Sequence, residues 1–208
     1  NYVKKHLDAG RQGYIICPLV DEGESDTELA SAVKYADELQ HGDFRGYTVG
    51  LMHGKMRSAD KKKVMESFSN GETQLLVSTT VIEVGVDVPN AVIMVIENAE
   101  RFGLSQLHQL RGRIGRGQYK STCILITDAK NDTAQRRMKV METTTDGFKI
   151  ADEDLKLRGP GEFFGSRQHG LPEMKIADML EDRSTLEETQ RAAREIIAHD
   201  PELSSPES

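Results

Sequence analysis

The sequence contains no long hydrophobic run and only two cysteines. No window approaches the roughly 18 apolar residues of a membrane-spanning helix, and the first ten residues have a charged, helical pattern, unlike a secretory signal. Cys17 and Cys123 each lie in an apolar run typical of a buried strand, which argues against a disulfide framework. We therefore expect a reduced, cytoplasmic protein without a membrane segment, and a chain that begins within a helix, as a fragment does.

Three motifs for ligand sites are also missing. The histidines show no metal-ligand spacing and there is no CxxC pair, so no metal site is predicted. The chain has no GxxxxGK(S/T) phosphate-binding loop, and without one Asp21-Glu22, which follow an apolar run, are not interpreted as an acidic DExx box. Any site for a nucleoside triphosphate would therefore be only half of a two-part site, completed by another domain.

Charge is distributed unevenly along the chain. The formal net charge is −7, with 27 lysines and arginines against 34 acidic residues, so the chain as a whole repels nucleic acid. The acidic excess lies at the two ends, in residues 1–46 and 181–208, whereas residues 101–120 carry five basic side chains and no acidic one. The local pattern predicts an anion-binding patch in the middle of the chain.

The segment QLHQLRGRIGRG, residues 106–117, is the centre of that patch. When it is drawn as one helix at 100° per residue, four polar side chains share an arc of about 80°: Gln106, Gln109, Arg113 and Arg116. Gly112 and Gly115 fall on the far side, where glycine costs helix stability and indicates a close approach to the backbone. Guanidinium groups along one face suit a phosphoryl group or a nucleic-acid backbone.

Apolar runs alternate with helical patterns over the first 130 residues. Strands are predicted at 13–19, 47–53, 73–79, 91–97 and 122–127, and helices at 26–40, 58–71 and 105–112. This alternation indicates an α/β fold with a parallel sheet and helices on both faces. Ligands of such sheets gather at the carboxyl ends of strands, where we place residues 53–56, residues 79–89 and the helix from Ser105.

Beyond residue 130 the alternation stops. Helices are predicted at 131–144 and 148–157, followed by a glycine-rich loop at 158–170 and a tail from 176 with two short amphipathic helices. We expect three parts: a domain at 1–130, a helical hairpin with its loop at 131–175, and a helical tail at 176–208. The acidic cluster Asp152, Glu153 and Asp154 is interpreted as a solvated helix face and not as an acid–base pair.

Two loops can hold phosphates. Thr79 and Thr80 follow a strand and can donate hydrogen bonds to a nucleic-acid backbone, and Gly85 permits close approach while Asp87 can accept from a ribose hydroxyl. An ordinary strand–loop–strand with a capping aspartate explains the same residues equally well. The second loop places His53, Gly54 and Lys55 before a basic helix, and a helix N-terminus preceded by glycine suits an anion.

These segments are similar to the motifs of superfamily 2 helicases. VSTTVIEVGVDVPNA (77–91) resembles motif V, QLHQLRGRIGRG resembles motif VI, and LMHGKM (51–56) resembles the region of motif IV. DGFKIADEDLKLRGPGEFFGSRQHG (146–170) resembles the translocation motif of the RecG and Mfd families, with a spelling closer to RecG. The resemblance implies a RecA-like three-layer fold, namely the second motor domain of a monomeric, ATP-dependent DNA helicase that remodels branched duplex DNA.

The resemblance also implies roles for single residues. Arg113 and Arg116 are the arginines that approach the γ-phosphate of ATP, which is held with Mg²⁺ mainly by a first motor domain. The resemblance implies that Gly85, Asp87 and Gln109 contact the nucleotide. It implies that the DNA is contacted by Thr79, Thr80, His53, Gly54 and Lys55. Arg137, Arg158 and Gln168 are implied to couple the nucleotide state of the protein to its movement along DNA. The partners implied are the first motor domain and a wedge domain.

Two other interpretations remain open at this point. The first is an Mfd-like translocase on double-stranded DNA, from the same superfamily. The second is a non-enzymatic nucleic-acid-binding module that retains a helicase-like fold. The intact arginines argue against the second, because an inactive module has no need of them.

Overall fold

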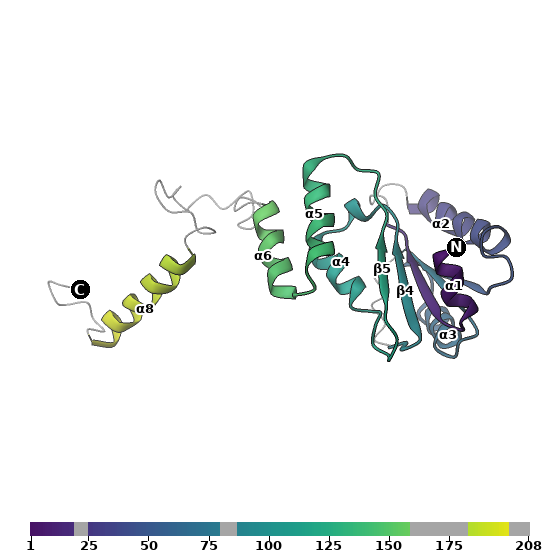
Figure 1. Cartoon of the computed structure of the whole chain (residues 1–208), viewed down its shortest axis with the longest axis horizontal. Coiled ribbons are helices and arrows are strands. Elements are labelled where there is room, and N and C mark those ends of the chain that lie inside the picture. Colours follow the sequence, from purple (N-terminus) through teal and green to yellow (C-terminus); the bar gives the residue numbers. More distant parts are fainter. Residues whose placement is uncertain (19–24, 80–86, 159–182, 200–208) are drawn as a thin grey trace. The chain divides into compact units, whose positions relative to one another are not determined.

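The structure is a computed structural model that describes residues 1–18, 25–79, 87–158 and 183–199 (Figure 1). Five strands form one parallel sheet in the order β2-β3-β1-β4-β5. They are β1 (Gln12–Ile16), β2 (Val49–Met52), β3 (Leu75–Ser78), β4 (Ala91–Ile96) and β5 (Thr122–Leu125). Each overlaps one of the predicted runs, so the parallel α/β sheet is confirmed.

Helices precede, connect and follow the strands. They are α1 (Tyr2–Asp8), α2 (Ser25–His41), α3 (Ser58–Ser69), the short 3₁₀ helix η1 (Ala99–Arg101), α4 (Leu104–Arg111), α5 (Asp132–Thr143), α6 (Gly147–Arg158) and α8 (Arg183–His199). Local signals explain several ends. Asn131 caps α5 by accepting a hydrogen bond from the Ala134 N–H at 2.8 Å, and Gly71 follows α3 with a positive φ of 81°.

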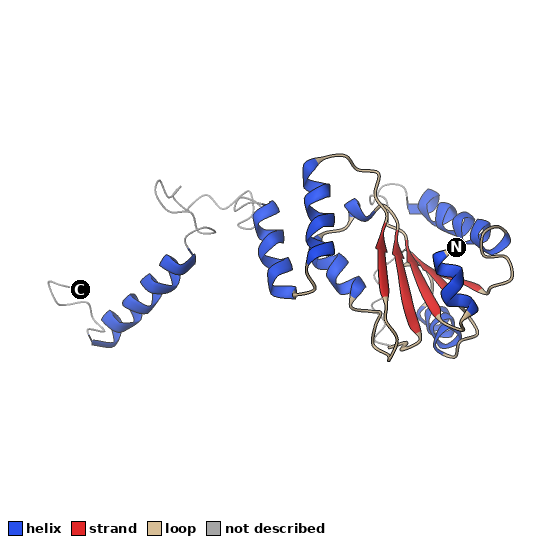
Figure 2. Cartoon of the chain, viewed as in Figure 1, coloured by secondary structure: helices blue, strands red, loops and turns tan. Residues whose placement is uncertain are grey.

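Helices cover both faces of the sheet, because alternate residues of a strand point to opposite sides. Ile15 of β1 packs in one core cluster with Leu7 of α1 and Leu39 of α2. Its neighbour Tyr14 points the other way and packs its ring against Phe68 of α3, with ring centroids 4.8 Å apart. Figure 2 shows the strands with helices on either side, which confirms the predicted three layers.

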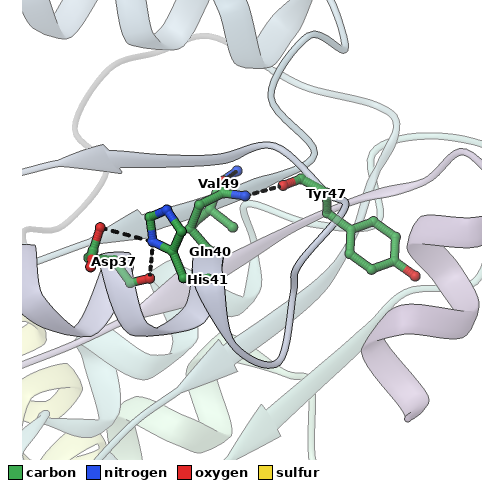
Figure 3. Close-up of polar contacts among 5 residues, drawn as sticks. All are labelled: Asp37, Gln40, His41, Tyr47 and Val49. Carbon is green, nitrogen blue, oxygen red and sulfur yellow. Dashed lines mark hydrogen bonds and ion pairs between the residues drawn. The ribbon is translucent and has the colours of Figure 1, made fainter.

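The end of α2 is held against the edge strand β2 by a side-chain amide (Figure 3). Gln40 donates through Nε2 to the Tyr47 carbonyl at 2.8 Å and accepts at Oε1 from the Val49 N–H at 2.8 Å. This contact satisfies a backbone group of a strand that has a partner strand on one side only. Beside it, the His41 ring lies 3.1 Å from the Asp37 carboxylate.

The strands of a parallel sheet all begin at one end of the sheet and finish at the opposite end. The end where the strands begin is called here the amino edge, and the end where they finish is called the carboxyl edge; both differ from the edge strand β2. Residues 87–90 and 112–121 precede β4 and β5 and lie at the amino edge, where the Gln12 N–H donates to the Asn90 carbonyl at 3.0 Å. At the carboxyl edge, the Thr79 N–H donates to the Met52 carbonyl at 3.2 Å. The two edges are the ends of the strands, so any sites on them are separated by the height of the sheet.

The chain forms two compact units, Asn1–Asp154 and Leu155–Ser208. The first contains the sheet, its helices, α5 and most of α6. In the second, α8 is one amphipathic helix that exposes Ile196 and Ile197. The predicted tail from 176 therefore contains a helix at 183–199; the rest of that prediction lies outside the described residues.

Candidate functional site

Asp87, Arg113 and Arg116 lie together at the amino edge. The Arg116 guanidinium forms an ion pair with the Asp87 carboxylate, and its Nε donates to the Gly112 carbonyl at 3.0 Å. The hydrogen bond that Arg116 donates to Asp87, together with the negative charge of Asp87, raises the pKa of Arg116 above its ordinary value. Arg113 is half-buried and, within the part of the chain that the structure describes, its guanidinium forms neither a hydrogen bond nor an ion pair. One arginine is thus held by a carboxylate, and the other is available to an anion.

The prediction that residues 79–89 lie at the carboxyl ends of the strands was wrong at Asp87, and α4 lies at that edge only at its start. A helix that connects two parallel strands runs antiparallel to them, so α4 begins near the carboxyl edge and ends near the amino edge. The connection from β3 to β4 makes the same return, because it leaves at Thr79 and reaches Asp87 just before β4. Asp87, Arg113 and Arg116 therefore lie at the amino edge, whereas His53 and Thr79 lie at the carboxyl edge.

Tyr14 belongs to this group, although no sequence motif singled it out. Its side chain is buried, and burial raises its pKa to about 12, with the charges of Arg113 and Arg116 opposing that rise and Asp87 adding to it. The phenol is therefore close enough to all three charged groups for their charges to affect its pKa. Tyr14 adds a buried, neutral phenol on the face of β1 opposite Ile15, and strand alternation was the only available signal for it.

Two glycines of the motif, Gly115 and Gly117, allow close contacts with other residues of the same chain. Gly115 has a positive φ of 77°, and a Cβ there would lie 2.4 Å from Ser121 Oγ. A Cβ on Gly117 would lie 2.4 Å from the Pro89 carbonyl oxygen. Gly112 has an ordinary negative φ and only ordinary contacts. The predicted close approach of the backbone is confirmed at Gly115, where its partner is the chain's own Ser121.

The helical arc of the motif extends only to Arg111, where α4 ends. Arg113 and Arg116 follow in the turn and loop, so the arc that joined them to Gln106 and Gln109 was wrong. The reason is the backbone, because Gly112 ends the helix and Gly115 reverses the chain. Gln109 is exposed, whereas the side-chain oxygen Oε1 of Gln106 caps α4 by accepting from the Gly103 N–H at 2.9 Å.

The side chains of α4 form three rows with a spacing of three residues. Leu104, Leu107 and Leu110 form the first row and are buried in the core. Gln106, Gln109 and Gly112 form an exposed row. Between them lies the third row, Ser105, His108 and Arg111, called here the hairpin row because each member contacts α5 or α6, the two helices of the hairpin.

The hairpin row makes polar contacts along its length. Arg111 donates through one nitrogen to the Met141 and Thr144 carbonyls, both at 2.9 Å, and its other nitrogen lies 3.2 Å from His108 Nδ1. Ser105 Oγ donates to Asp154 at 3.5 Å. Asp154 is only 8% exposed, so the predicted solvated face of the acidic cluster is wrong at this residue. Sequence reasoning missed the hairpin row, because Arg111 was counted only among the five basic side chains of residues 101–120.

At the carboxyl edge, His53 and Thr79 lie next to each other, because Met52 and Ser78 are partners in adjacent strands. Gly54 and Lys55 form the exposed turn that leads into α3, whose N-cap has no side-chain hydrogen bond. Burial and the charges of Lys61 and Lys55 lower the pKa of His53, whose Nδ1 has no partner among the described residues. Thr80 and Gly85 lie outside those residues.

Of the predicted coupling residues, the structure describes the surroundings of Arg137. It lies on α5 and donates weakly to the Glu100 carbonyl at 3.5 Å, while its Nε is buried without a partner among the described residues. Arg158 is the last residue of α6, but its side chain, like the whole of Gln168, lies outside the description. The predicted network of the three stays a prediction.

The described residues contain no group of three or more histidine, cysteine, aspartate or glutamate side chains placed to hold a metal ion. Among the same residues, no helix is long and apolar enough to cross a membrane. The two cysteines are free and half-buried.

Comparison with known proteins decides the family. The helicase conserved C-terminal domain matches residues 1–118, more than half of the chain. A second family, described as ATP-dependent DNA helicase RecG, domain 3, C-terminal, matches residues 144–208. The chain belongs to the helicase conserved C-terminal domain family, in its RecG branch. The resemblance inferred from the motifs is therefore confirmed, and the RecG interpretation is favoured over the Mfd-like one.

Individual RecG relatives agree. The ATP-dependent DNA helicase RecG of Bacillus subtilis is 52% identical over 207 residues, which cover 99% of this chain and 30% of that protein. The RecG of Synechocystis is 49% identical over 97% of this chain and 24% of its own length. A solved structure of RecG bound to a three-way DNA junction matches with a TM-score of 0.67 and 45% identity, over 89% of this chain and 23% of that one. The chain thus spans about a third or less of the length of these relatives.

Proposed function

We propose that this chain is the second motor domain, with its translocation hairpin, of an ATP-dependent helicase that remodels branched DNA. The observation that carries the proposal is the pair of arginines at the amino edge, in a chain that has no phosphate-binding loop of its own. Membership of the RecG branch supports ATP hydrolysis as the reaction and branched DNA as the substrate. The branched DNA, the first motor domain, a wedge domain, a monomeric state and a cytoplasmic location are all part of this proposal.

The amino edge suits the triphosphate end of ATP. Two guanidinium groups near a dry phenol can neutralise charge on a phosphoryl group, and one of them is already free of carboxylate partners among the described residues. ATP supplies the phosphoryl group that is transferred to water, and the donor set here fits its γ-phosphate. A lone carboxylate does not make a Mg²⁺ site, so the first motor domain holds most of the metal's ligands. Gly85, Asp87 and Gln109 contact the rest of the nucleotide.

The carboxyl edge suits a DNA backbone. Thr79, Thr80, His53, Gly54 and Lys55 offer hydroxyl, amide and ammonium donors, and α3 adds its uncapped N-terminus and further lysines. Phosphate contacts of this kind hold a duplex without reading its sequence. Because the two sets of residues lie at opposite edges of one rigid sheet, DNA binding and ATP hydrolysis are separable by substitution.

The hairpin links the two activities. Arg137 has a buried nitrogen without a described partner, and such a group requires a hydrogen-bond acceptor nearby. We assign Arg137, Arg158 and Gln168 to coupling. Alanine at Arg158 or Gln168 is expected to leave ATP hydrolysis active while fork reversal fails, and normal fork reversal by these variants would contradict the assignment.

The test of the function compares the isolated chain with the full-length protein that contains it. DNA-stimulated ATP hydrolysis is measured for both on a branched DNA and on a linear duplex of equal length. The proposal predicts a silent chain beside an active full-length protein that prefers the branched DNA. Turnover by the isolated chain would show a complete nucleotide site and overturn the half-site assignment. Silence in both would favour the non-enzymatic module.

A further inference from the structure

We propose that Arg111 is a positioning residue that fixes the helical hairpin to the motif VI helix, and that it has no part in binding ATP. The inference deepens the proposed function and rests on it. It starts from the hairpin row of α4, which neither the motif resemblance nor the family match assigns a role.

Arg111 acts at the end of α5. The last carbonyl groups of a helix have no partner within the helix and carry partial negative charge, which a cation stabilises. Helix α5 has no basic residue in its own last turn. Arg111 of α4 supplies the missing charge and donates to the Met141 and Thr144 carbonyls, both at 2.9 Å. Both acceptors are backbone atoms, so the contact depends on Arg111 alone.

His108 extends the contact to the turn between α5 and α6. Its Nδ1 lies 3.2 Å from the Arg111 guanidinium, and a Cβ placed on Gly147, the first residue of α6, would lie 3.0 Å from its Nε2. Glycine at 147 therefore lets the turn close against the imidazole. Arg111 and His108 together seat both arms of the hairpin at one point of α4.

The position of Arg111 in the chain gives the contact its consequence. Arg113, the arginine assigned to the γ-phosphate, follows two residues later, and Arg113 N–H donates to the Leu110 carbonyl at 2.9 Å. A short, hydrogen-bonded turn thus separates the nucleotide-facing arginine from the hairpin-facing one. Movement of Arg113 toward a nucleotide is therefore expected to displace Arg111 and, through it, the end of α5 and the start of α6.

The test uses the full-length protein and the variant Arg111→Met, which keeps an unbranched side chain of similar length and removes all donors. Arg136→Met is the matched control, because Arg136 is an exposed arginine on α5. Two quantities are measured: kcat and KM of DNA-stimulated ATP hydrolysis, and the number of base pairs remodelled per ATP. Arg111→Met is expected to keep kcat and KM within about threefold of wild type while base pairs per ATP fall about tenfold or more.

Each other result has a defined meaning. Unchanged base pairs per ATP in Arg111→Met would overturn the inference, and so would a loss of kcat equal to that of Arg113→Ala. Arg111→Lys keeps the charge with a compact head and is expected to give an intermediate ratio; if Arg111→Met does not fold, this variant decides. An inactive wild-type protein would instead refute the proposed function, so the two failures are distinguishable.

Discussion

The Arg116 guanidinium is paired with the Asp87 carboxylate, and the same two residues are assigned to ATP. Both side chains are about half exposed, so the ion pair contributes little to the stability of the fold. Its importance lies in position. It holds Arg116 at the amino edge, and under the proposed function a γ-phosphate would take the place of the carboxylate as the partner of that arginine.

Alanine at Arg113 or Arg116 is expected to lower kcat of ATP hydrolysis in the full-length protein about 10³-fold or more, the scale typical of an arginine finger. Affinity for branched DNA should change little, because the DNA-type residues lie at the opposite edge of the sheet. ATPase assays and fluorescence anisotropy at fixed salt measure the two effects. Arg101→Ala, also exposed in the basic segment, is the control. A kcat within a few-fold of wild type would refute the assignment.

Alanine at Asp87 is expected to act differently. A contact to the ribose is equally strong in the ground state and in the transition state, so its loss raises KM for ATP, by about tenfold, and leaves kcat nearly unchanged. Steady-state kinetics over a range of ATP concentrations measure both constants. A fall in kcat with an unchanged KM would show instead that Asp87 acts by orienting Arg116.

Alanine substitutions are expected to have different effects on stability at Gly112 and Gly115, the two glycines to which the sequence analysis gave the same role. Gly115→Ala forces a side chain into positive φ and against Ser121 Oγ, and is expected to cost about 1–3 kcal/mol of folding free energy. Gly112→Ala has a negative φ and room for a methyl group, and is expected to change stability by less than about 0.5 kcal/mol. Urea unfolding of the isolated chain measures both. Equal effects would show that the backbone at 115 can relax.

The sequence predicts what depends on local chemistry. Apolar, β-branched runs identify all five strands, and Asn70-Gly71 correctly marks the end of α3. Prediction from the sequence fails where the position of a residue depends on contacts with residues far away in the chain. Nothing near Arg111 indicates that its partners are the carbonyls of Met141 and Thr144, and only the return of α4 across the sheet places Arg113 at the amino edge. Helical periodicity misled for the same reason, because the turn after Gly112 ends the periodic segment.

Substitution of Gln12 by leucine is expected to destabilise the fold by about 2–4 kcal/mol. Gln12 is only 2% exposed, and its Nε2 donates to the Phe68 carbonyl and, at 2.7 Å, to the Thr73 carbonyl. Leucine of similar volume removes the side-chain donor from both carbonyls, although the Phe68 carbonyl keeps the Gly71 N–H as a donor at 3.1 Å. Thermal unfolding followed by circular dichroism measures the loss, with the exposed Gln135→Leu as control. A melting temperature equal to that of the control would show that water replaces the amide.

The free energy of unfolding is expected to fall as the pH rises from about 9 to about 11. Burial raises the pKa of Cys123 to about 11 and the pKa values of Cys17 and Tyr14 to about 12. In the unfolded chain these groups titrate near about 8.5 and 10. Within this window the unfolded chain has therefore released protons that the folded chain still holds, so each increase in pH favours unfolding.

Urea unfolding at pH values across that window measures the slope. Tyr14→Phe keeps the ring that packs against Phe68 and removes one titrating hydroxyl, so its stability should fall less steeply with pH than that of wild type. Tyr119→Phe, on an exposed ring, is the control and should keep the wild-type slope. Identical slopes for wild type and Tyr14→Phe would mean that the Tyr14 hydroxyl reaches water in the folded protein. Tyr14 would then not be a buried, neutral phenol near Arg113 and Arg116.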